Sequence, residues 1–137
     1  MESLFMALAE KTRLRLLNLM RSDQEVCVGS FVKILGVSQP KISRHLAYLR
    51  NAGVVRASRG GKWVRYSIAR FDPKEARDVF ETLFDWLDSD QAMRHEREKY
   101  IELIELPESF IFAETHTNER DIERSEPAHN ELEEFLL

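Results

Sequence analysis

The sequence has one cysteine, no long apolar run and no recognisable catalytic motif. Cys27 is the only cysteine among 137 residues, so no disulfide can form within the chain, which suits a reducing cytoplasm. No apolar run approaches the roughly 18 residues of a membrane span, and the first residues do not resemble a signal peptide. Phosphate-binding glycine loops and nucleophile elbows are also missing. These absences favour a cytoplasmic protein that is not an enzyme, uses no cofactor and contacts no membrane.

Acidic side chains are scarce in the first half of the chain and abundant in the second. Residues 1–70 contain 13 Lys/Arg and 4 Asp/Glu, whereas residues 71–137 contain 7 and 20. The overall net charge of −4 therefore conceals a basic half of +9 and an acidic half of −13. This asymmetry predicts that the first half binds a polyanion, and it gives the second half a solvated or regulatory role.

Residues 38–53 predict a short helix with two unlike faces. Ser38 is a good N-cap and Gly53 a good stop. The apolar residues recur at the spacing of a buried stripe, and they are Ile42, Leu46 and Leu49. The opposite face has hydrogen-bonding groups and positive charge without an acid, from Gln39, Lys41, Ser43, Arg44, Tyr48 and Arg50. A helix can use such a face to enter the major groove of DNA, although a merely solvated face is the alternative.

The segments around this helix predict a winged helix-turn-helix. Residues 26–35 predict a preceding helix, and residues 35–38 are a short glycine-containing connector. Residues 54–58 and 63–68 predict two strands, the second with strict alternation of apolar and polar residues. The segment 59–62, with two glycines between basic residues, is the expected tip of their hairpin. The expected fold class is α+β, mostly α, with a two-stranded β-hairpin wing.

Four further helices are expected, over residues 2–9, 13–21, 72–88 and 90–106. Thr12 and Ser89 are the expected N-caps of the second and fourth. The third carries more apolar and aromatic surface than one small domain easily covers, so we expect a dimer interface that includes the N-terminal helix; a core within one chain is the alternative. The expected interface residues are Leu4, Phe5, Leu8, Val79, Phe80, Leu83, Phe84 and Leu87.

We expect the chain to consist of two parts. Residues 1–106 form the expected DNA-binding and dimerisation domain, and residues 107–137 form an acidic C-terminal tail. The tail shows no clear helical or strand period before its last six residues. Its charge suggests the hypothesis that it acts as an internal mimic of DNA that weakens non-specific binding.

Three blocks of sequence, at residues 12–17, 35–55 and 61–66, resemble the ArsR/SmtB family of bacterial winged-helix repressors. The run Ser-Gln-Pro-Lys-Ile-Ser-Arg-His-Leu, at residues 38–46, is most similar to the arsenic-responsive branch. The resemblance covers roughly residues 4–88. It implies a homodimeric transcriptional repressor that binds double-stranded DNA at an inverted-repeat operator and is released by an effector. The alternative is a winged-helix module that contacts proteins and has no operator specificity.

The resemblance also assigns roles to side chains of the basic half. Base contacts are expected from Gln39, Ser43 and Arg44, and phosphate contacts from Lys41 and Ser38. The wing residues Arg59, Lys62 and Arg65 are expected to add salt-dependent phosphate contacts. His45 precedes the buried Leu46, so we expect it to pack or to hydrogen-bond the backbone.

The expected metal sensor is incomplete. Arsenic-responsive members carry Cys-Val-Cys before the recognition helix, and three thiolates capture trivalent arsenic. Here Cys27 matches the first thiol, whereas Gly29 replaces the second. The family's other metal site uses Asp/His pairs on the dimer helix, and residues 72–88 contain no histidine. We therefore predict no metal site. Cys27 is either a small buried hydrophobe or a thiol sensor near a helix N-terminus.

Overall fold

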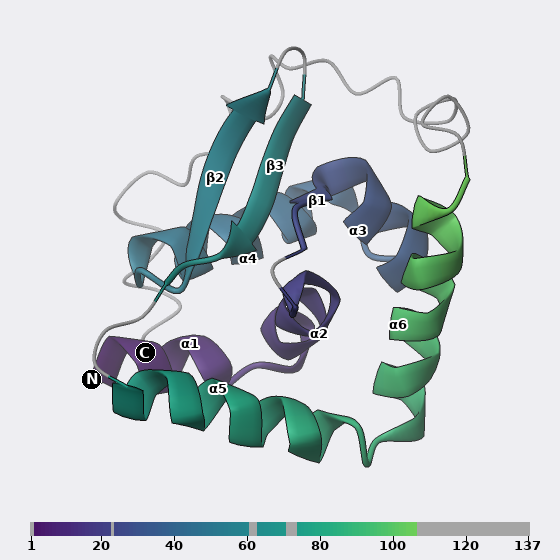
Figure 1. Cartoon of the computed structure of the whole chain (residues 1–137). Coiled ribbons are helices and arrows are strands. Elements are labelled where there is room, and N and C mark those ends of the chain that lie inside the picture. Colours follow the sequence, from purple (N-terminus) through teal and green to yellow (C-terminus); the bar gives the residue numbers. More distant parts are fainter. Residues whose placement is uncertain (1, 23, 61–62, 71–73, 107–137) are drawn as a thin grey trace.

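A computed structural model describes residues 2–22, 24–60, 63–70 and 74–106, which form six helices and three strands (Figure 1). The expected contact Lys62, the start of the helix at residues 72–73 and the whole of the acidic tail lie outside these residues. The elements are α1 Glu2–Leu8, α2 Lys11–Met20, β1 Val26–Cys27, α3 Val28–Leu35, α4 Gln39–Asn51, β2 Val55–Gly60, β3 Trp63–Ile68, α5 Lys74–Leu87 and α6 Gln91–Ile104.

The sheet has three antiparallel strands in the order β1-β3-β2, and not the expected two. The hairpin is confirmed, because β2 and β3 pair from Val55↔Ile68 to Gly60↔Trp63. The helix expected at residue 26 begins only at Val28, since β1 pairs with β3 through Val26↔Tyr66 and Cys27↔Arg65. This pairing gives backbone partners to the edge of β3 that a two-stranded hairpin would leave open.

The hydrophobic core lies around α2. Leu16, Leu17, Leu19 and Met20 of this helix are at most 1% exposed, and α2 contacts α3, α4, α6 and β3. A helix that is buried on nearly all sides has to carry apolar residues around most of its circumference. α2 is therefore the element on which the rest of the domain packs.

Two N-caps differ from the expected ones. The carboxylate of Glu10 accepts a hydrogen bond from the backbone N–H of Arg13 at 2.8 Å, so Glu10 and not Thr12 caps α2. The carboxylate of Asp90 accepts from the N–H groups of residues 92 and 93 and caps α6. Ser89, the expected cap, instead donates its hydroxyl to the carbonyl of Trp86 at the end of α5. Neighbouring polar residues compete for the same cap, and the direction of the incoming chain selects one.

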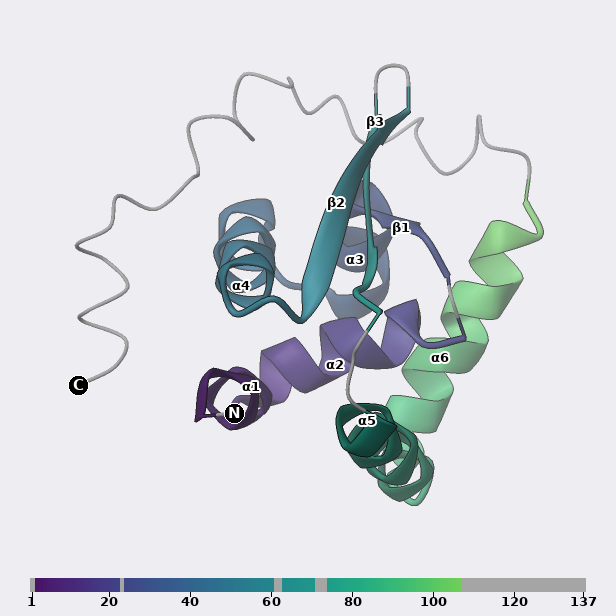
Figure 2. The ribbon, with the colours of Figure 1, turned by 60° about the vertical axis from the view of Figure 1, so that its left-hand side comes forward.

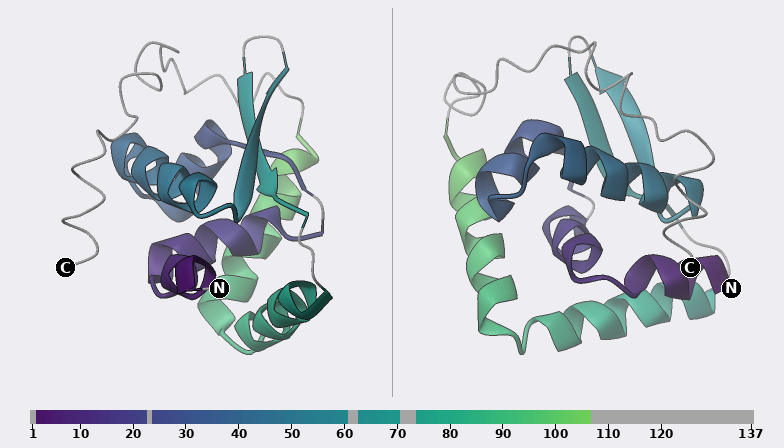
Figure 3. Two further views of the ribbon diagram at one scale, coloured as in Figure 1. Left: turned by 90° about the vertical axis from the view of Figure 1, so that its left-hand side faces the viewer. Right: turned by 180° about the vertical axis from the view of Figure 1, so that it is seen from behind.

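The elements place the hairpin and the pair α1–α5 at opposite ends of the molecule (Figures 1 and 2). α6 leaves the end of α5 and runs along the side of the domain towards α3 (Figure 3). It packs inward with Met93, Tyr100 and Leu103. The longest helices of the described residues, α5 and α6, have 14 residues each and many charges, so neither can cross a membrane.

Candidate DNA-binding surface

The helix α4 is held by its apolar stripe and by the turn before it. Ile42, Leu46 and Leu49 are 0% exposed, which confirms the predicted stripe. Gly36 ends α3 with φ 63°, a left-handed conformation that glycine adopts without strain, and its N–H donates to the carbonyl of residue 32. Ser38 occupies the N-cap position of α4, but its side chain makes no capping hydrogen bond. The hydroxyl of Ser38 is therefore not committed to the helix end.

The outer face of α4 presents two cations to solvent. Lys41 and Arg44 are exposed, and among the described residues no hydrogen bond or ion pair engages their side chains. Gln39 is half-buried at the start of the helix. Ser43 departs from the expectation for a base-contacting residue, because it is only 8% exposed. Its position beside the buried stripe turns it towards the core, so Lys41 and Arg44 dominate this face.

Arg59 and Arg65, the two hairpin arginines expected to contact phosphate, lie on opposite faces. Alternate residues of a strand share a face, so Arg59 lies on the same face as Val55 and Ala57, which pack against the core below α4. Arg59 is exposed near the tip. Arg65 lies on the other face, beside Ser58 of β2 in the pairing register, and is half-buried. Of the two described wing residues expected to contact phosphate, Arg59 is the more exposed.

Arg13 connects α4 to the N-terminal helix. Its guanidinium lies 4.2 Å from the ring centroid of Tyr48 on α4. The same group donates to the carbonyls of Ala7 at 2.8 Å and Met6 at 3.1 Å, at the end of α1. An arginine near the last carbonyls of a helix satisfies acceptors that have no partner within the helix. The sequence interpretation did not single out Arg13, because this role depends on residues from three different helices.

His45 lies against the N-terminal part of the chain. Its Nδ1 is 3.8 Å from Oε2 of Glu10, a contact that the sequence analysis did not anticipate. Burial lowers the pKa of His45 below its ordinary value of 6.5, and the cations Arg13, Arg44 and Lys41 lower it further, while Glu10 opposes them. The imidazole is thus held towards its neutral form, so the positive charge of α4 comes from Lys41, Arg44 and Arg50.

Cys27 lies at the N-terminus of α3, the position that its interpretation as a thiol sensor requires. The thiol is half-buried, and its Sγ lies 3.1 Å from the hydroxyl of Ser30. Burial and the proximity of Cys27 raise the pKa of Tyr100 to about 12. Within the residues that the structure describes, no three His, Cys, Asp or Glu side chains come together in a way that could hold a metal ion.

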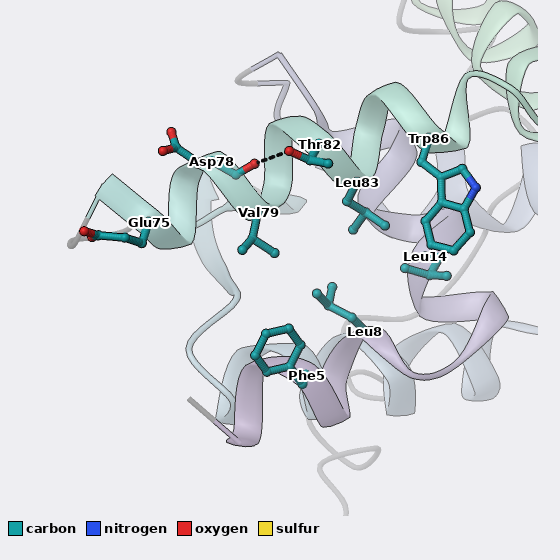
Figure 4. A pocket seen from close by; sticks show the side chains of 9 residues that line it. All are labelled: Phe5, Leu8, Leu14, Glu75, Asp78, Val79, Thr82, Leu83 and Trp86. Carbon is teal, nitrogen blue, oxygen red and sulfur yellow. Dashed lines mark hydrogen bonds between the residues drawn. The ribbon is translucent and has the colours of Figure 1, made fainter.

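An apolar groove of about 590 Å³ separates α1 from α5, on the side of the molecule away from the hairpin (Figure 4). Trp86 is 74% exposed and Phe5 is 54% exposed, unusual values for large apolar side chains. The apolar lining consists of Phe5, Leu8, Leu14, Val79, Leu83 and Trp86. This groove is the largest concentration of exposed aromatic surface on the described residues.

The residues expected at a dimer interface fall into two groups, because some line the groove and others are buried within the chain. Phe80 is 5% exposed and Leu87 is 8% exposed, so both belong to the core of the chain itself. The rings of Phe80 and Phe84 contact each other with centroids 6.0 Å apart. The expected set omitted Trp86, the most exposed aromatic residue of α5. The apolar stripe of α5 is wide enough to have an inner and an outer edge. Only the packing of α5 on the domain shows which apolar residues are buried and which line the groove.

Comparison with known proteins matches residues 10–57 to the model of the bacterial regulatory protein, arsR family. The chain is 40% identical over 96 residues to the arsenical resistance operon repressor of Escherichia coli, covering 70% of this chain and 74% of that protein. It is 47% identical over 64 residues to an arsenic resistance transcriptional regulator of Pseudomonas putida, covering 47% of this chain and 50% of that protein. Among solved structures, HlyU from Vibrio cholerae is similar with a TM-score of 0.52 and 30% identity, over 61% of this chain and 89% of HlyU.

Proposed function

The chain belongs to the arsR family of bacterial regulatory proteins, and from this premise we propose how it acts: as a homodimer that places one α4 of each protomer in the major groove of an inverted-repeat operator. The family consists of regulators, and the chain is a DNA-binding transcriptional repressor. In a symmetric dimer of this kind, the two recognition helices lie roughly 34–36 Å apart, one turn of duplex.

The pair Lys41 and Arg44 is the observation that supports this binding mode most. Both are exposed on a helix whose opposite face is fully buried, so the helix is rigidly held while its cations face outward. We assign Arg44 and Gln39 to base edges, and Lys41 and Ser38 to phosphates. Arg59 adds a phosphate contact from the hairpin. Ser43 contributes less than its position in the sequence suggests, because it is nearly enclosed.

The groove between α1 and α5 is the surface that we assign to the second protomer. Its exposed residues Phe5 and Trp86 come from the two helices that lie farthest from the hairpin tip (Figures 1 and 4). A second copy that covers these helices leaves both α4 helices and both hairpins accessible to DNA. Burial of such aromatic surface is a strong driving force for association.

We also propose that an effector lowers the DNA affinity, and that this effector is not trivalent arsenic captured by three thiolates of one chain. These 137 residues contain a single cysteine. Soft metals in proteins normally need three or four ligands, and one thiolate cannot supply such a site. The arsenic resistance in the names of the relatives from Escherichia coli and Pseudomonas putida is therefore not assigned to this chain.

Substitution of the two exposed cations of α4 tests the binding mode. Arg44→Ala should weaken binding to the protein's upstream DNA by roughly 1–3 kcal/mol and relax base preference at one position. Lys41→Ala should weaken binding to all sequences alike and lower the salt slope by about 1. Binding is measured by fluorescence anisotropy with the upstream duplex and a scrambled duplex at two salt concentrations.

Matched controls are Arg94→Ala and Lys99→Ala, which remove the same charges from exposed positions of α6. They should change the affinity by less than about twofold, because they lie outside the α4 surface. Equal losses in the controls would contradict the assignment of α4. Equal, weak binding of the wild-type protein to both duplexes would instead favour the protein-contact module over the operator-specific repressor.

A further inference from the structure

The α4 and hairpin region forms an unbroken basic part of the chain. Residues 26–70 contain nine Lys/Arg and no Asp or Glu. Exposed cations on this part include Lys41, Arg44, Arg50 and Arg59, from α4 and β2, which contact each other. A region with this excess of cations has a positive surface potential, and a flexible polyanion nearby is attracted to it. We call these four residues the basic surface.

The part of the chain that follows has the opposite charge. Residues 74–106, which include α5 and α6, contain ten Asp/Glu and five Lys/Arg. Residues 107–137, the acidic tail, contain nine Asp/Glu and two Lys/Arg, a net charge of −7. The tail is therefore repelled by α5 and α6, to which it is attached, and attracted by the basic surface. Charge complementarity singles out one partner for the tail within the chain.

We propose that the acidic tail occupies the basic surface in the DNA-free protein and competes there with the phosphates of DNA. This inference rests on the proposed function, because the competed surface is the one assigned to DNA. The tail acts as a tethered polyanion, and no base-specific contact is required of it. The proposed occupant of the basic surface is therefore the acidic tail, residues 107–137.

The attachment of the tail permits this contact. α6 ends at Ile104, on the side of the molecule where α3 lies and away from the α1–α5 end (Figure 3). Thirty-one extended residues reach roughly 100 Å, whereas a domain of about 100 residues has a radius of gyration of about 13 Å. The tail is long enough to reach α4 from there. A tethered ligand of this kind has an effective concentration on the order of millimolar.

Competition by the tail affects non-specific DNA most. Non-specific binding depends on phosphate contacts alone, and the tail offers carboxylates to the same cations. Operator binding adds base contacts that the tail cannot replace, so the tail increases the ratio of specific to non-specific affinity. Salt weakens the attachment of the tail and the binding of DNA together. The affinity of the wild-type protein should therefore depend less steeply on salt than that of a variant with a neutral tail.

Two full-length variants with equal charge changes test the inference. The tail variant replaces five acids with amides: Glu119→Gln, Asp121→Asn, Glu123→Gln, Glu133→Gln and Glu134→Gln. The control variant does the same at exposed positions of α5, of α6 and of the C-cap of α6: Glu81→Gln, Asp85→Asn, Glu98→Gln, Glu102→Gln and Glu105→Gln. Affinity for an unrelated duplex is measured by fluorescence anisotropy at two salt concentrations. In the DNA-free proteins, amide resonances of α4 are compared by NMR.

The tail variant should bind the unrelated duplex roughly 3- to 10-fold more tightly than wild type and with a steeper salt slope, whereas the control should change by less than about twofold. Resonances of α4 should shift in the tail variant alone. Equal gains in both variants would show a general effect of net charge and overturn the inference. Unchanged affinity in the tail variant would overturn it while leaving the proposed function intact. Failure of wild type and variants to bind any duplex would overturn both.

Discussion

Three arginines, two in α2 and one at its C-cap, act inside the domain and not at the proposed DNA surface. Arg13 donates to carbonyls at the end of α1. Arg15 pairs with Glu96 of α6 at 2.8 Å, and Arg21 pairs with Asp88, just after α5, also at 2.8 Å. Each guanidinium thus joins the central helix to a different neighbour, a use for which its planar fork is suited. The +9 charge of the first half therefore overstates the charge available to DNA.

His45 provides a test at the scale of a single residue. Its pKa in the folded protein lies below the ordinary 6.5, mainly because of burial, so the unfolded chain binds the proton more readily. The stabilising contribution of neutral His45 is fully present above pH 6.5 and is lost as the pH falls from there towards the folded-state pKa. We expect the free energy of unfolding, measured with urea, to fall between pH 7.5 and 5.5 more in wild type than in His45→Gln.

The outcome also decides whether burial or the contact with Glu10 has the larger effect on the pKa of His45. If His45→Gln loses more stability than wild type over the same pH range, then the ion pair with Glu10 outweighs burial, and the direction given for the pKa is wrong. Glu10 also caps α2 through the N–H of Arg13, so substitution of Glu10 would remove the cap and the contact with His45 together. His45→Gln leaves that cap in place and keeps a polar side chain beside Glu10.

At the scale of elements, α5 has two edges with different partners. Its inner edge is covered by the domain through Phe80 and Leu87, whereas its outer edge forms the groove with α1. Arg21 fixes the end of α5 by donating to the carbonyl of Phe84 at 3.1 Å. α5 is therefore anchored from within the chain, and its outer edge is presented at a defined position to a second copy.

The substitution Phe5→Glu tests the proposed role of this outer edge. Burial of one phenylalanine side chain contributes roughly 1.5–3 kcal/mol, and a symmetric interface buries it twice. We therefore expect the dimer dissociation constant, measured by analytical ultracentrifugation, to rise by at least about tenfold. Phe5 is 54% exposed in the single chain, so the fold should persist, which circular dichroism checks.

The matched control is Ile101→Glu, which introduces the same charge at an apolar residue of α6 that is 43% exposed. It should leave the dimer intact, because Ile101 does not line the groove between α1 and α5. If Ile101→Glu dissociates the dimer and Phe5→Glu does not, α6 and not the groove forms the interface.

At the scale of the whole molecule, the hairpin and the groove assigned to dimerisation lie at opposite ends of each protomer, with α4 between them (Figures 1 and 2). Two protomers joined through α1 and α5 therefore each contribute one α4 and one hairpin. The number of phosphates neutralised sets the slope of the logarithm of the binding constant against the logarithm of salt concentration. A dimer should contact about twice as many phosphates as one protomer.

We expect Phe5→Glu, when monomeric, to bind operator DNA with about half the salt slope of wild type. The measurement is a salt titration of anisotropy at a protein concentration where ultracentrifugation shows monomers. Since Phe5 lines the groove between α1 and α5 and does not belong to α4, its loss should leave the contacts of one half-site unchanged. An unchanged slope in the monomer would contradict the arrangement with one α4 per half-site.

Most of the helices and the hairpin could be predicted from the sequence, because their signals are local. The spacing of Ile42, Leu46 and Leu49 needs only one helix to be recognised, and the alternation before Ile68 needs only one strand. The basic character of the first half and the single cysteine are likewise properties of the chain itself. These local patterns, with the family resemblance they support, were sufficient to identify α4 as the candidate DNA reader.

Only the tertiary structure decided the features that depend on residues distant in sequence. β1 exists because Val26 and Cys27 meet β3 about 40 residues later. Ser43 is nearly enclosed because α4 packs on the domain. Arg59 and Arg65 lie on opposite faces because the register pairs Arg65 with Ser58. Periodicity shows that a helix has an apolar side, but the neighbours determine how much of that side they cover. The sequence by itself therefore determined the candidate DNA-reading helix, and packing decided which of its side chains are exposed.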